Sequence, residues 1–139
     1  MRAAIDTNVF VSSFFGGLPL KVIEYWFSGR LTLCVSKPIL KEYFDVLNRF
    51  EFDDKALLYR LMSAFERNFN LLFVNNPKEQ MWIKEDPADN KFIACALALK
   101  AEYIVSGDAH LRKLKHIENI QIISPAEMQD LLGDERCRD

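Results

Sequence analysis

The chain has 139 residues and half of them are hydrophobic, which suffices for a single domain with a packed core over residues 1–139. Eighteen basic and 20 acidic side chains give a formal net charge of −2. This balance argues against a protein that coats nucleic acid through bulk positive charge, but it permits a contact with phosphate that a metal ion bridges.

Strands and helices are predicted to alternate along the chain. Short apolar runs indicate strands, whereas helical spacing of apolar residues with capping residues indicates helices. In chain order we expect a strand before Asp6, a helix over 19–28, a strand over 31–35, a helix from Ser36 to about Phe50, a helix from Asp53 to Phe69, a strand over 71–74, a helix from Asp86 to Lys100, a strand over 102–106, a short helix after Asp108, a strand over 120–124 and a helix from Pro125.

This alternation favours an α/β fold: a three-layer α/β/α sandwich around a mainly parallel sheet of about five strands. Its longest apolar run, IACALAL, is too short to span a membrane. Cys34 and Cys95 lie in apolar runs, as reduced core thiols do. We therefore expect a cytoplasmic protein without a membrane span.

Two aspartates follow predicted strands. Asp6 comes after the first strand and Asp108 after the fourth, and in parallel sheets ligands bind beyond the carboxyl ends of the strands. Each residue alone could simply cap a turn or a helix. As a metal ligand, Asp6 would be oriented by Thr7 or Asn8, whereas Ser106 and Gly107 give the fourth strand a tight exit before Asp108.

Two further acids are candidates for the same edge. In DPADNKF, Asp86 suits the helix cap and Asp89 the first turn, where a carboxylate also points over the sheet edge. We take Asp89 as the ligand and Asp86 as the cap. Glu42 lies at the boundary of an apolar helix arc, where it could reach a cleft or simply be solvated.

Four carboxylates in one pocket repel one another. Two of them about 4 Å apart cost roughly 4 kcal/mol at an effective dielectric constant near 20. A cation would offset this repulsion, and an all-oxygen ligand set suits Mg²⁺ or Mn²⁺ rather than zinc.

The segments AIDTNVFVSS, ILKEYFDVL, DPADNKFIACALALKAEYIVSGDAHL and IQIISPAEM resemble, in this order, the PIN-domain family and most of all its VapC-like toxins. The resemblance covers nearly the whole chain. It implies a PIN-like parallel sheet and a Mg²⁺- or Mn²⁺-dependent endoribonuclease whose acidic quartet is Asp6, Glu42, Asp89 and Asp108. It also implies a cognate antitoxin and a possible homodimer. Where many VapC-like toxins carry a further acid, this chain has His110.

On this hypothesis RNA phosphodiester bonds are hydrolysed with the help of one or two metal ions. Basic side chains beyond the metal would contact the RNA. The candidates are Lys37, Lys41, Lys91, His110, Arg112, Lys113 and Lys115.

Three other functions remain open from the sequence. A PIN fold could bind RNA or a protein without cutting. A haloacid-dehalogenase-type phosphohydrolase would need a second aspartate at position 8, where this chain has Asn8. A receiver-like domain would need its phosphorylated aspartate on a central strand, which the early Asp6 fits poorly.

Overall fold

A six-stranded sheet forms the centre of the computed structural model, which describes residues 1–84 and 86–137. The strands are β1 (Arg2–Ile5), β2 (Thr32–Ser36), β3 (Leu71–Val74), β4 (Tyr103–Val105), β5 (His116–Ile117) and β6 (Ile120–Ile123). Their order is β3-β2-β1-β4-β6-β5, and every pairing is parallel except that of β5 with β6. The predicted parallel sheet is confirmed, and the short strand β5 adds a sixth member.

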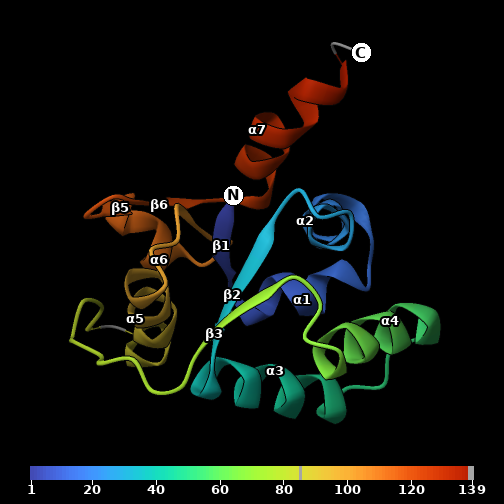
Figure 1. The fold of residues 1–139 in the computed structure, drawn as a ribbon, viewed down its shortest axis with the longest axis horizontal. Coiled ribbons are helices and arrows are strands. Elements are labelled where there is room, and N and C mark those ends of the chain that lie inside the picture. Colours follow the sequence, from blue (N-terminus) through green and yellow to red (C-terminus); the bar gives the residue numbers. More distant parts are fainter. Residues whose placement is uncertain (85, 138–139) are drawn as a thin grey trace.

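Helices cover both faces of this sheet. They are α1 (Thr7–Ser13), α2 (Gly17–Phe27), α3 (Lys37–Arg49), α4 (Lys55–Glu66), α5 (Asn90–Ala98), α6 (Ala109–Leu114) and α7 (Pro125–Cys137), with a 3-10 turn η1 (Pro87–Asp89) before α5. Figure 1 shows α5 and α6 on one side of the sheet and α1, α2 and α4 on the other. This is the three-layer arrangement that the sequence predicts. Among the helices described, none has the length and apolar character needed to cross a bilayer.

The core lies between these layers. Strand β1 occupies the middle of the sheet, and the side chains of Ala3, Ala4 and Ile5 are fully buried. Helix α5 packs across β1, β2 and β4. On the other face, the ring of Phe10 lies 4.5 Å from that of Tyr43, centre to centre. Strand β1 is therefore held from both sides, which fixes the position of the residue that follows it.

Three local features differ from the prediction. Helix α1 follows β1 directly, where only a turn was expected, because its seven residues are too few to show a clear helical period. Helix α4 is capped by Asp54 and not by Asp53: the Asp54 carboxylate accepts a hydrogen bond from the Leu57 amide at 2.9 Å. The helix expected from Asp86 is divided into η1 and α5.

Candidate metal centre

Asp6 lies at the carboxyl end of the central strand. Its amide donates a hydrogen bond to the Val105 carbonyl at 2.9 Å, which continues the pairing of β1 with β4. Asp6 is only 4% exposed. One carboxylate oxygen accepts a hydrogen bond from the Asn8 amide at 3.4 Å, so Asp6 also caps α1. The capping role and the position at a candidate site therefore belong to the same residue.

Ser106 connects the two strand-end aspartates. Its hydroxyl donates a hydrogen bond to Asp6 Oδ2 at 2.7 Å and accepts one from the Asp108 amide at 2.9 Å. The serine is fully buried, directly after β4. Because β1 and β4 are neighbours in parallel, this one hydroxyl bridges the segments that carry Asp6 and Asp108.

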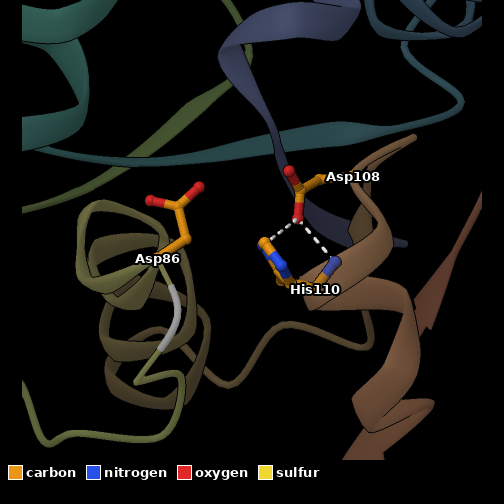
Figure 2. A group of neighbouring side chains, drawn as sticks. All are labelled: Asp86, Asp108 and His110. Atoms are coloured by element: carbon orange, nitrogen blue, oxygen red, sulfur yellow. Dashed lines mark hydrogen bonds and ion pairs between the residues drawn. The ribbon is translucent and has the colours of Figure 1, made fainter.

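Asp108 caps helix α6. Its Oδ1 accepts hydrogen bonds from the amides of His110 at 2.8 Å and Leu111 at 3.1 Å, and it lies 3.9 Å from His110 Nδ1 (Figure 2). These contacts all use Oδ1. Within the described residues the second oxygen, Oδ2, makes none of these contacts and can therefore serve a ligand.

Asp89 is the acid with the least compensation. It lies at the end of η1 and is only 9% exposed. Within the described part of the chain, its Oδ2 has no hydrogen-bond partner. Burial, reinforced by the negative charges of Asp6, Asp108 and Asp86, raises the pKa of Asp89 to about 8. A buried carboxylate in such a setting is unfavourable as an anion unless a cation accompanies it.

Asp86 occupies the predicted cap position before η1, but its side chain makes no capping hydrogen bond. Its carboxylate instead joins Asp108 and His110 in a group whose ligand atoms all lie within 4.8 Å of one another. Figure 2 shows Asp86 at the start of the α5 segment, across from the pair on α6. Among the described residues, this is the tightest set of potential metal ligands.

Glu42 reaches the site from α3. It accepts a hydrogen bond from the Thr7 hydroxyl and forms an ion pair with Lys91, with 2.7 Å between Oε1 and Nζ. The next residue, Tyr43, is buried and its hydroxyl donates a hydrogen bond to the Ile5 carbonyl. Tyr43 thereby ties α3 to the end of β1. Nothing in the sequence indicated this polar contact.

The four predicted acids share one electrostatic environment. Burial raises the pKa of Asp6, and the charges of Asp108 and Glu42 raise it further, while hydrogen bonds from Ser106 and Asn8 oppose the shift. Asp89 experiences the charges of both Asp6 and Asp108. The structure thus brings these residues together from four separate segments, although Asp6, Glu42 and Asp89 do not belong to the compact group around Asp86.

The predicted RNA-contacting residues are placed differently from one another. Lys91 is paired with Glu42. Lys37 and Lys41 are exposed on α3. On α6, Arg112 is exposed and lies 3.9 Å from Glu127. His110 and Lys113 border a cavity that is described below, and Lys115 is exposed at the end of the helix.

The donor set suits a hard divalent cation. It offers carboxylate oxygens from Asp6, Asp86, Asp89 and Asp108, with one imidazole at the rim, and one of the buried oxygens lacks any partner within the described residues. Such ligands favour Mg²⁺ or Mn²⁺, of which Mn²⁺ also tolerates imidazole. The site therefore has the chemistry of an oxygen-rich metal centre at the carboxyl edge of a parallel sheet.

Comparison with known proteins identifies the class. Residues 2–110 match the model of the PIN domain, so the chain belongs to the PIN domain family. Its structure is similar to that of a chain in the crystal structure of VapBC2 from Rickettsia felis bound to a DNA fragment from their promoter. The TM-score is 0.54 and the identity is 15%, over 89% of this chain and 98% of that chain, which shows a shared fold. No curated protein matches the sequence.

Proposed function

We propose that this protein is a metal-dependent endoribonuclease and the toxin of a toxin–antitoxin pair, acting in the cytoplasm. The observation that carries the proposal is a buried Asp89 oxygen that has no hydrogen-bond partner among the described residues, while the charges of Asp6, Asp108 and Asp86 act on the same side chain. Membership of the PIN domain family supports nuclease activity. The fold shared with a chain of VapBC2 supports a partner antitoxin.

In the proposed reaction, Asp6, Asp89 and Asp108 would hold the metal ion, with Asp86 and His110 beside them. A bound Mg²⁺ or Mn²⁺ ion supplies Lewis-acid polarisation of the phosphate and lowers the pKa of water. Ser106 orients Asp6 through its 2.7 Å hydrogen bond. These residues thus concentrate negative charge where a cation and an RNA phosphate would meet.

Glu42 has a separate role in this proposal. It lies between Thr7 and Lys91, and Asp6 experiences its charge. From this place its carboxylate would orient the attacking water and accept its proton. Lys91 would hold Glu42 in position through their ion pair.

The test compares the wild type with Asp6→Asn on a panel of single-stranded and structured RNAs, in Mg²⁺, in Mn²⁺ and in EDTA. Asp45→Asn is the matched control, because Asp45 is an exposed acid on α3. We expect EDTA-sensitive cleavage by the wild type and the control, and a loss of at least about 100-fold in Asp6→Asn, since even residues that only orient ligands are worth 10- to 100-fold.

Thermal melts would show that Asp6→Asn is folded, and equal purification of all three proteins controls for contaminating ribonuclease. Equal cleavage by the wild type and Asp6→Asn would refute the role of Asp6. Absence of cleavage together with RNA binding would favour a PIN fold that binds without cutting.

A further inference from the structure

A cavity of about 290 Å³ lies beside the metal centre on the α6 side. It is lined by Trp82, Ile83, Lys84, His110, Lys113 and Leu114. His110 also belongs to the compact ligand group with Asp86 and Asp108. The cavity and the candidate metal centre therefore share His110 and lie next to each other.

The charges of this cavity are opposite to those of the metal centre. Lys84 and Lys113 are exposed, and among the side chains that the structure describes neither forms an ion pair. Among the described residues, none of those that line the cavity is acidic. Two ammonium groups that have no ion-pair partner within the described part of the chain, next to a cluster of carboxylates, mark a place for an anionic ligand that extends beyond the metal.

The wall that carries Trp82 and Lys84 is fixed to the metal centre. Ile83, between them, is buried, and its amide and carbonyl both bind the side chain of Asn90, at 2.9 and 3.1 Å. Asn90 is itself buried and directly follows Asp89. This two-point contact holds Trp82 and Lys84 in place relative to the acid that most needs a cation.

Trp82 gives the cavity an aromatic wall. Its side chain packs partly against the core and is half-buried, so an indole surface remains for a ligand. An aromatic surface beside lysines, without acids, is the combination that binds single-stranded nucleic acid: the base stacks and the backbone phosphate meets the ammonium groups. A purely anionic ligand such as an acidic peptide would leave the indole unused.

We infer that this cavity binds one nucleotide of a single-stranded RNA segment, next to the phosphodiester bond that the metal centre cleaves. The base stacks on Trp82, and Lys84 and Lys113 hold the adjacent phosphate. This inference rests on the proposed function for its substrate, and it adds that the substrate is unpaired at that nucleotide. A paired base is already stacked within its duplex and would not be free to enter the cavity.

Tryptophan fluorescence tests binding separately from cleavage. The chain has two tryptophans, and Trp26 is fully buried, so Trp82 is the reporter. A six-nucleotide single-stranded RNA and a duplex of the same length are titrated into the protein, in EDTA and in Mg²⁺. RNA recovered from each titration is run on a denaturing gel to score cleavage. We expect quenching by the single strand and little by the duplex.

Variants locate the contact. Labelled RNA followed by anisotropy should bind Trp82→Leu about 5- to 100-fold more weakly and Trp82→Phe nearly as the wild type does, because only phenylalanine keeps a stacking face. For Lys84→Ala and for Lys113→Ala, the slope of a plot of the logarithm of the binding constant against the logarithm of the salt concentration should be smaller in magnitude by roughly 0.7. Lys78→Ala, an exposed lysine that does not line the cavity, is the matched control. Thermal melts confirm that each variant is folded.

The outcomes separate the two proposals. Quenching without cleavage would retain the nucleotide site and refute the nuclease. Cleavage without quenching would refute the nucleotide site and retain the nuclease. The same conclusion would follow if Lys84→Ala and the control Lys78→Ala were quenched by RNA to the same extent as each other. Equal quenching by duplex and single strand, or quenching by poly-glutamate and not by RNA, would also overturn the inference, the latter in favour of a protein partner.

Discussion

The two halves of the candidate metal centre are stabilised in opposite ways. On the strand side, the Asp6 carboxylate accepts hydrogen bonds from the Ser106 hydroxyl and a backbone amide, the Asp108 carboxylate accepts from two backbone amides, and each aspartate caps a helix. On the α5 side, Asp86 makes no capping bond and Asp89 buries an oxygen that has no partner among the described residues. The first half serves the fold with or without a metal, whereas the ionised form of the second is unfavourable without a cation.

The largest effect is expected at Asp89. Asp89→Asn should reduce RNA cleavage by at least about 100-fold, as loss of a metal ligand does, yet raise the melting temperature of the metal-free protein at pH 8. The rise follows because the substitution removes a buried negative charge that three other acids repel. Cleavage assays measure the expected loss of activity, and thermal melts in EDTA measure the expected rise in melting temperature. A lower melting temperature would show that the Asp89 charge is compensated.

Ser106→Ala should lower the stability of the protein, whereas Asp89→Asn should raise it. It leaves a buried Asp6 oxygen and the Asp108 amide without their partner, which costs about 1–3 kcal/mol in the free energy of unfolding. Urea denaturation in EDTA measures this cost. Ser13→Ala is a useful comparison, because that serine is also buried but only binds the carbonyl of Phe10 in its own helical segment. Equal costs for both would mean that the bridge between strand ends adds nothing.

The metal-free protein should become less stable as the pH rises. A higher pH ionises the buried carboxyl group that Asp89→Asn removes, so both experiments probe the same charge. Asp6 and Asp89 have raised pKa values in the fold, chiefly through burial, against 3.8 when unperturbed. The folded protein therefore holds more protons than the unfolded chain between about pH 4 and pH 8, so the free energy of unfolding falls as pH rises across this range. Melts in EDTA should show that fall, and it should be shallower in Asp89→Asn. A wild-type stability that rises from pH 4 to pH 8 would contradict the shift.

The smallest effect is expected at Lys91. Lys91→Met keeps most of the side-chain length but removes the partner of Glu42, and we expect a loss of about 1 kcal/mol or less, because the pair is partly exposed. Urea denaturation of Lys91→Met beside Lys41→Met, an exposed lysine on α3, isolates the pair. A loss as large as that of Ser106→Ala would place Glu42 among the residues that hold the fold.

The sequence predicted the strand side of the site better than the α5 side. Asp6 and Asp108 could be found because they follow apolar runs, and parallel strands place their carboxyl ends at one edge. The position of the Asp86 carboxylate near His110 could not be predicted in this way, because Asp-Pro before a helix is an ordinary capping pattern and only the three-dimensional fold brings the two side chains together.

The same difference holds for the fold. The parallel sheet and most helices follow from periodicity, and Ser36 caps α3 as predicted, with its hydroxyl accepting from the Ile39 amide at 3.3 Å. Contacts between segments that are distant along the chain leave no periodic or capping pattern in the sequence. The Tyr43 hydroxyl on the Ile5 carbonyl and the Asn90 side chain on Ile83 depend on how the layers pack.

The most direct test of a metal centre that depends on Asp89 is calorimetric titration with Mn²⁺ at pH 8, for the wild type, Asp89→Asn and the exposed control Asp45→Asn. We predict that the wild type and Asp45→Asn bind Mn²⁺ with equal affinity and that Asp89→Asn binds at least about 10-fold more weakly. Equal binding by all three proteins, or no binding by the wild type, would contradict the account.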